Sequence, residues 1–150
     1  MEGIHIKRFN ELTINELYRL LRLRSEVFVV EQNCVYQDLD DDDQQALHLW
    51  ITDNNDNIIA MARVCAAGTH MHEVSIGRVI STKRRQGYGT VIVREAISAA
   101  KNIWGAGIID IEAQVYTRSL YEKLGFTQTS EPFMLDGIPH IKMRYSQQSE

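Results

Sequence analysis

The sequence predicts a mixed α/β fold, with a mostly antiparallel sheet of about seven strands and one parallel pair at its centre. Two observations support this prediction. Short segments rich in β-branched residues are bounded by turn residues, whereas longer segments repeat their apolar residues at helical spacing. In the middle of the chain a strand, a loop, a helix and another strand follow one another. That order is typical of a crossover between parallel strands, with helices on the faces of the sheet.

The N-terminal third begins with a predicted strand over 4–9, where apolar residues stand near alternate positions. Thr13 and Glu16 have the spacing of a capping box, so we expect a helix over about 14–28. Arg24 stands within the apolar stripe of this helix. The segment 31–45 contains an acidic run at 38–43 and is expected to be a solvated loop, with room for a short second helix.

The remaining elements follow from alternation, helical periodicity and glycine stops. Residues 53–57 are all Asp or Asn, which predicts a turn. Gly105 and Gly125 each end a helical pattern. Asp136-Gly137 predicts a tight hairpin turn. The predicted strands are 47–52, 58–65, 73–80, 108–113, 133–135 and 138–145, and the predicted helices are 90–104 and 117–124.

Composition narrows the class of protein. The 150 residues fit one domain, 1–150, and 16 basic against 20 acidic residues give a net charge of −4. An acidic chain is a poor nucleic-acid binder, so we expect no nucleic-acid partner. The N-terminus has no signal-peptide pattern, and no apolar run is long enough to cross a membrane. Two cysteines, Cys34 and Cys65, cannot form a disulfide framework, which favours a cytoplasmic protein.

The loop 81–89 is the most informative stretch, because it joins a predicted strand to a predicted helix. Lys83, Arg84 and Arg85 are basic, and Gly87 and Gly89 let backbone amides approach a ligand closely. A helix N-terminus adds unpaired amides and a partial positive charge, so this loop is typical of a phosphate or pyrophosphate cradle. Neither the P-loop pattern nor the dinucleotide-binding glycine pattern is present.

The pattern Arg84-x-x-Gly87-x-Gly89 resembles the pyrophosphate-binding motif of the GCN5-related N-acetyltransferases. Residues 120–126, which read LYEKLGF, resemble a later signature of that superfamily. Five further segments resemble the ElaA-type acetyltransferases: 24–40, 48–49, 76–79, 113–114 and 136–140. The resemblance implies the known fold, with about four helices flanking the sheet, and an acetyl-CoA-dependent transfer of an acetyl group to a primary amine.

The resemblance also implies which residues bind acetyl-CoA. The backbone before the loop, near Arg78, Val79 and Ile80, would hold the pantetheine arm and polarise the acyl carbonyl. The amides of the loop would take the pyrophosphate. The complete set expected to bind the cofactor is Arg78, Val79, Ile80, Arg84, Arg85, Gln86, Gly87, Tyr88, Gly89, Thr90, Gln114, Ser119 and Tyr121. No metal is expected. The acceptor would be a small molecule or a peptide, and the protein a monomer or homodimer.

Two residues are expected to be catalytic. The phenol of Tyr121 can donate its proton to the leaving thiolate, because the ordinary pKa values of the two groups are close. Glu73 stands 14 positions before Gly87, the offset of the general base in one branch of the superfamily. Glu31, Glu112 and Gln114 are alternative candidates for this general base. His140 is expected near the substrate end of the site.

Two alternatives remain at this point. A non-catalytic acyl-CoA sensor would bind the cofactor at the same loop without catalysing a reaction. A general protein-interaction domain would need neither the cofactor nor catalysis. The acidic run does not match an EF-hand, and it can instead attract a cationic amine. Cys34 is expected to be a small buried residue rather than a nucleophile.

Overall fold

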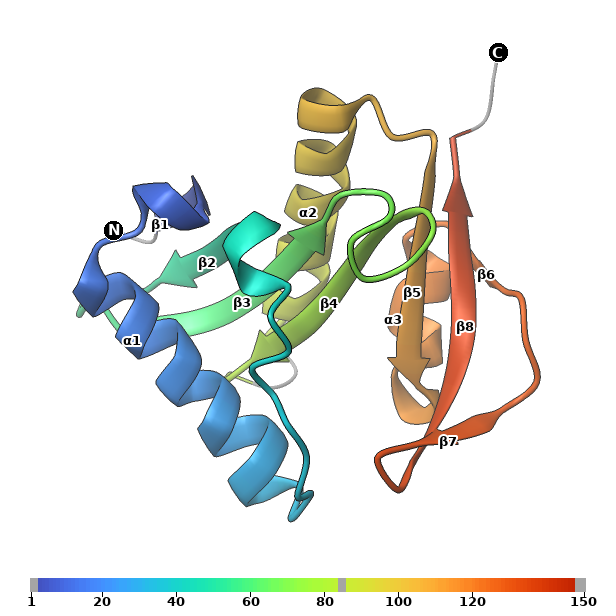
Figure 1. The fold of residues 1–150 in the computed structure, drawn as a ribbon, viewed down its shortest axis with the longest axis horizontal. Coiled ribbons are helices and arrows are strands. Elements are labelled where there is room, and N and C mark those ends of the chain that lie inside the picture. Colours follow the sequence, from blue (N-terminus) through green and yellow to red (C-terminus); the bar gives the residue numbers. More distant parts are fainter. Residues whose placement is uncertain (1–2, 84–85, 148–150) are drawn as a thin grey trace.

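The computed structural model describes residues 3–83 and 86–147 and shows a single eight-stranded sheet with helices on both faces (Figure 1). The strand order is β1-β2-β3-β4-β5-β8-β6, and β7 pairs with β8. The strands are β1 Gly3–Arg8, β2 Leu47–Thr52, β3 Ile58–Cys65, β4 Val74–Ser81, β5 Ile108–Gln114, β6 Phe126–Gln128, β7 Phe133–Leu135 and β8 Ile138–Ser146. Among these strands β4 and β5 are parallel and every other pair is antiparallel, which confirms the predicted fold class.

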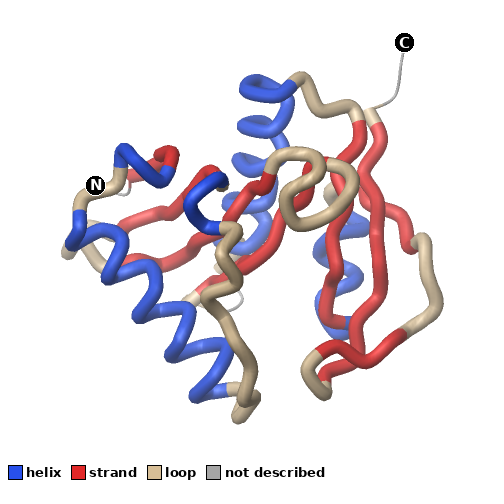
Figure 2. The backbone as a smooth tube through the Cα atoms, in the orientation of Figure 1, coloured by secondary structure: helices blue, strands red, loops and turns tan. Residues whose placement is uncertain are grey.

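The helices differ from the prediction in number and in length. The three α-helices are α1 Ile14–Arg24, α2 Tyr88–Trp104 and α3 Arg118–Lys123. Four short helical turns accompany them: η1 Phe9–Glu11, η2 Ser25–Glu31, η3 Asp43–Gln45 and η4 Val115–Thr117. The first helix ends as an α-helix at Arg24 and continues as the π-helical turn η2, a change of winding that apolar spacing does not reveal. Figure 2 shows the loop after η2 running back alongside α1 to η3.

The helix α1 covers one face of the first half of the sheet. Its capping box is formed as predicted, since the Thr13 hydroxyl accepts from the Glu16 amide at 3.1 Å and the Glu16 carboxylate accepts from the Thr13 amide at 2.9 Å. Leu20 packs in a small core with Trp50 and Met61, and this burial of apolar side chains holds the amphipathic helix on the sheet. This packing fixes one side of the cleft that is described below.

The helix α2 covers the opposite face and fills the larger core. Its buried residues, which include Ile92, Val93 and Ala96, pack against the sheet. In Figure 1 the helix lies behind the strands. Gly105 ends the helix in a left-handed conformation with φ of 63°, as the sequence predicts. Within the described part of the chain, no helix is long and apolar enough to cross a membrane.

The strand β4, at which the sheet divides, contains a bulge. Met61 pairs with Ile80 and Arg63 with Gly77, so the two residues 78 and 79 face only one residue of β3. Arg78 has a left-handed backbone, with φ of 51°. The strands β4 and β5 share only two residue pairs, Val74 with Ile109 and Ser75 with Asp110. Beyond these pairs the two strands diverge (Figure 1).

Candidate active site

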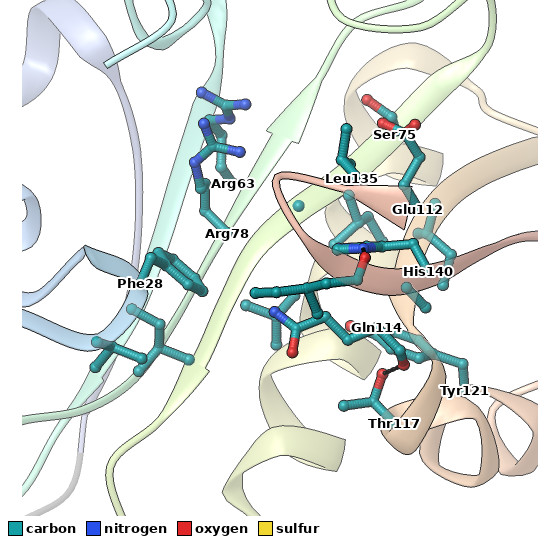
Figure 3. A pocket seen from close by; sticks show the side chains of 18 of the residues that line it. Phe28, Arg63, Ser75, Arg78, Glu112, Gln114, Thr117, Tyr121, Leu135 and His140 are labelled. Atoms are coloured by element: carbon teal, nitrogen blue, oxygen red, sulfur yellow. Dashed lines mark hydrogen bonds between the residues drawn. The ribbon is translucent and has the colours of Figure 1, made fainter. Parts of the chain in front are cut away.

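A cleft of about 860 Å³ lies where β4 and β5 diverge, with side chains from both half-sheets on its walls (Figure 3). It is large enough for a small-molecule ligand or cofactor. Of the residues predicted to bind the cofactor or to act in catalysis, the structure places eight on its lining: Arg78, Val79, Ile80, Gly87, Gly89, Thr90, Gln114 and Tyr121.

The first end of the cleft is the turn from β4 into α2. Gly87 is the N-cap of α2 and has φ of 79°, a conformation that L-residues other than glycine rarely adopt. The helix begins at Tyr88, two residues earlier than predicted, so its first amides and its partial positive charge stand at the cleft. Gln86 and Tyr88 flank this turn without lining the cleft, and the predicted Arg84 and Arg85 lie outside the described residues.

The opposite wall carries Tyr121, which α3 places against the end of β5. Tyr121 is 7% exposed, and its ring meets Phe126 edge-on at 5.6 Å between centroids. Burial, with a smaller effect from Tyr116, raises the pKa of Tyr121 well above its ordinary value, so the phenol stays protonated at neutral pH. The Thr117 hydroxyl donates to the Gln114 carbonyl at 2.6 Å and joins this helix to the strand.

Two further predicted site residues do not line the cleft. Ser119 is exposed on α3. Glu73, the expected general base, precedes the first residue of β4, at the opposite end of that strand from the α2 turn. Its carboxylate lies 4.0 Å from the exposed imidazole of His72. The structure therefore does not bring Glu73 to Tyr121.

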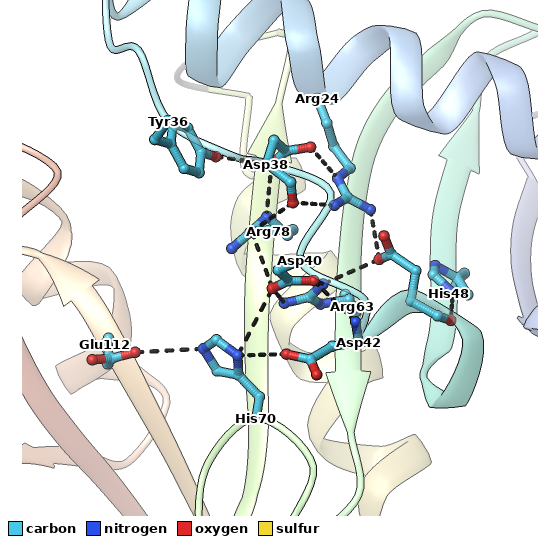
Figure 4. A network of polar contacts seen from close by, with 11 residues as sticks. Arg24, Tyr36, Asp38, Asp40, Asp42, His48, Arg63, His70, Arg78 and Glu112 are labelled. Carbon is cyan, nitrogen blue, oxygen red and sulfur yellow. Dashed lines mark hydrogen bonds and ion pairs between the residues drawn. The ribbon is translucent and has the colours of Figure 1, made fainter.

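The acidic run 38–43 is not a solvated loop, and the prediction is wrong for its two most buried members. Asp38 and Asp43 are 5% and 6% exposed, and they belong to an arginine–aspartate cluster that the loop folds over (Figure 4). The members of the cluster are Arg24, Arg63, Arg78, Asp38, Asp40 and Asp43. Buried charges of both signs neutralise one another here, because an unpaired buried charge would be costly.

The cluster connects the first helix to the cleft wall. Arg24 donates to Asp38 at 2.9 Å and to Asp43 at 2.7 Å, and Arg78 donates to Asp38 at 2.8 Å. Arg63 donates to both oxygens of Asp40, at 2.7 and 2.9 Å. Burial alone would raise the pKa of Asp40, but the Arg63 guanidinium holds it well below its ordinary value.

The sequence does signal two members of this cluster. Arg24 occupies an apolar-stripe position of α1, and Arg63 stands in the middle of a strand whose residues are otherwise apolar. Each arginine is only 1% exposed. A charged residue at a buried position of an amphipathic pattern indicates a buried partner of opposite charge, and the acidic run supplies it.

His70 links the two half-sheets at the polar end of the cleft. Its Nδ1 lies 2.8 Å from an oxygen of Asp42, and its Nε2 lies 3.5 Å from an oxygen of Glu112 on β5. The Glu112 carboxylate, with help from Asp42 and against the effect of burial, raises the pKa of His70. The same contact lowers the pKa of Glu112, so this end of the cleft holds a carboxylate that stays ionised.

His70→Gln is expected to flatten part of the pH dependence of stability. The folded-state pKa of His70 lies above the unfolded value of about 6.5, so its stabilisation is fully present below that pH. It is lost as the pH rises through the folded-state value. The melting temperature of the wild type should therefore exceed that of His70→Gln by more in mild acid than at alkaline pH. His72→Gln, at a side chain that is 96% exposed, is the control. A wild-type advantage that does not change with pH would contradict the prediction.

The sheet thus splits at one parallel pair, with the N-terminus of α2 on one side of the split and the buried Tyr121 on the other. The model of the Acetyltransferase (GNAT) domain matches residues 11–147. The chain therefore belongs to the GNAT acetyltransferase family.

Individual relatives agree with this assignment. Protein ElaA of Escherichia coli (strain K12) is 36% identical over 137 residues, which are 89% of this chain and 90% of that protein. The crystal structure of Escherichia coli ElaA has a TM-score of 0.90 and 33% identity, and covers 97% of this chain and 100% of its own. The crystal structure of an acyl-CoA N-acyltransferase from Pseudomonas aeruginosa has a TM-score of 0.89 and 36% identity, with the same coverage. The resemblance to ElaA-type acetyltransferases is confirmed.

Proposed function

We propose that this protein transfers an acetyl group from acetyl-CoA to a primary amine, by direct attack while both reactants are bound. The observation that carries this proposal is the cleft itself, because one space is lined by a helix N-terminus, a strand bulge and a buried tyrosine. A cleft between diverging strands can hold two reactants side by side. Such positioning supplies much of the rate of a bimolecular transfer.

The cofactor would enter at the α2 turn. The first amides of α2 and the Gly87 turn suit the pyrophosphate, since unpaired amides at a helix N-terminus favour anions. The pantetheine arm would then follow β4 to the bulge at Arg78 and Val79. There a backbone amide can donate to the acyl oxygen as negative charge develops on it. Arg78 itself points its guanidinium to Asp38, so its side chain fixes the bulge rather than the cofactor.

Tyr121 supports the enzyme over a sensor that only binds acyl-CoA. Its phenol is buried on the cleft wall and stays protonated, which is the state needed to donate a hydrogen bond to the departing thiolate. The test is release of the free CoA thiol with a panel of alkylamines, diamines, amino sugars and a lysine peptide. Binding of acetyl-CoA without turnover of any amine would favour the sensor instead.

Gly87→Ala is expected to raise the KM for acetyl-CoA about tenfold. The left-handed backbone at this position costs an L-residue about 1–2 kcal/mol, and relief of that strain would move the first amides of α2 away from the phosphates. Gly105→Ala is the matched control, because Gly105 has φ of 63° at the other end of the same helix. Both variants should lose similar stability. An equal KM in the two variants would contradict the placement of the phosphates.

A further inference from the structure

The face of β5 and β8 on the cleft side is polar, whereas their other face is buried in the core. Along β5 the residues Ile109, Ile111 and Ala113 are buried, and the residues between them are partly exposed. Side chains alternate between the faces of a strand, so the polar residues of both strands share one face. The antiparallel register pairs Asp110 with Arg144, Glu112 with Lys142 and Gln114 with His140. Of these residues, Glu112, Gln114 and His140 line the cleft.

His140 is held in a defined state on this wall. It is 8% exposed, and its Nδ1 lies 2.7 Å from the carbonyl oxygen of Ile138. A carbonyl can only accept a hydrogen bond, so in the neutral imidazole Nδ1 carries the proton and Nε2 carries the lone pair. Across residues 3–83 and 86–147, no hydrogen bond occupies Nε2. Figure 3 shows the imidazole inside the cleft beside Leu135 and Gln114.

The strand order places His140 across the cleft from the expected position of the acyl group. Ser75 of β4 pairs with Asp110 of β5 in the parallel ladder. Beyond this pair the strands diverge, and Val79 of β4 and Gln114 of β5 both line the cleft between them. Gln114 in turn is the register partner of His140. The imidazole therefore stands on the wall opposite the β4 bulge, where the acyl carbonyl is proposed to bind.

We propose that His140 is the general base that deprotonates the acceptor amine; this inference rests on the proposed acetyl transfer. A primary ammonium gives one proton to Nε2 of His140 and becomes a neutral amine. Its lone pair forms the new C–N bond to the acyl carbon, and the C–S bond breaks. The thiolate takes a proton from Tyr121, and the phenolate regains one from the nitrogen. The net products are an amide, the CoA thiol and one proton, and this proton is bound to His140.

The charges around His140 suit a cationic acceptor. Glu112 on β5 and Asp136 in the turn before β8 are acidic, while Lys142 on β8 is exposed and basic. The fourth charged neighbour is His70, which contacts Glu112 from the loop before β4. Glu112 stays ionised, so it attracts an ammonium to the wall on which the base stands. Glu73 does not line the cleft.

His140→Asn tests the inference, since an asparagine amide can still donate to the Ile138 carbonyl but cannot take a proton. At neutral pH, kcat/KM for the best alkylamine of the panel should fall about a hundredfold, within the range for loss of a general base. A fluorinated analogue that is already neutral at that pH should lose far less. The alkylamine should regain activity as the pH approaches its own pKa, because solution then supplies the neutral amine.

The affinity for acetyl-CoA and the melting temperature separate this role from a structural one. Both should stay near wild type in His140→Asn. Should His140→Asn unfold, His140→Gln in the same two-amine comparison carries the test. An equal loss with the cationic and the neutral amine would overturn the inference, as would a loss in Glu73→Gln that His140→Asn does not show. A wild type that acetylates no amine would overturn the proposed function, and the base with it.

Discussion

Replacement of Tyr121 by phenylalanine should lower kcat by about three orders of magnitude, within the range known for loss of general acid catalysis. The phenylalanine keeps the edge-on contact with Phe126, so the fold and the cleft should persist. The hydroxyl alone is removed. Because burial raises the pKa of Tyr121, this hydroxyl stays protonated throughout the neutral range and can donate a hydrogen bond to the thiolate.

The measurement is kcat from thiol release at saturating amine, together with the affinity for acetyl-CoA. The affinity should hardly change, because the phosphates are expected at the other end of the cleft. Tyr18→Phe, on the exposed face of α1, is the matched control. An unchanged kcat in Tyr121→Phe would remove the phenol from the mechanism.

Replacement of Arg24 by methionine should cost about 3–5 kcal/mol of unfolding free energy, the usual penalty for breaking a buried ion pair from one side. Arg24 is 1% exposed and holds both Asp38 and Asp43. Methionine fills much of the same space but leaves two buried carboxylates with fewer cations. The loop that forms one wall of the cleft should therefore loosen first.

Urea denaturation followed by fluorescence measures this cost. Arg19→Met is the matched control on the same helix, since Arg19 pairs with an Asp56 side chain that is 78% exposed. A surface pair of this kind contributes less than about 1 kcal/mol. Equal costs at the two positions would show that the arginine–aspartate cluster is not held by Arg24. Adding Asp43→Asn to Arg24→Met should recover part of the loss, because two arginines and two aspartates then remain in the cluster.

Local pattern was sufficient to predict most of the fold. Both hairpins, the α1 capping box and the glycine stop of α2 follow from residues close together in sequence, and the structure contains all of them. The strand β6 was not predicted, because it has three residues and two of them are exposed. Apolar spacing predicts a single helix across α1 and η2, because the spacing continues across the change of winding.

The site was harder to predict, because it depends on where two strands part. A motif can identify the α2 turn and the tyrosine, and both do line the cleft. Distance along the chain from Gly87 singled out Glu73, yet the bulge and the short β4–β5 ladder decide which residues face the cleft. His140 reaches the cleft wall only because β8 pairs with β5 in the register that sets it beside Gln114. Local spacing alone does not contain that register.

The short ladder between β4 and β5 leaves two strand edges facing each other inside the sheet. Elsewhere such edges invite a second protein chain to add a strand, with aggregation as the result. Here α2 and the loop after η2 enclose the gap, and its mouth is crossed by hydrogen bonds from Gln32 to Gln114 and from Cys34 to Asp136. In the proposed function this gap takes the pantetheine arm of acetyl-CoA, whose amide groups can form hydrogen bonds with the free strand edges. Unpaired strand edges, which favour aggregation at the rim of a sheet, thus serve in the proposed function to bind a ligand at its centre.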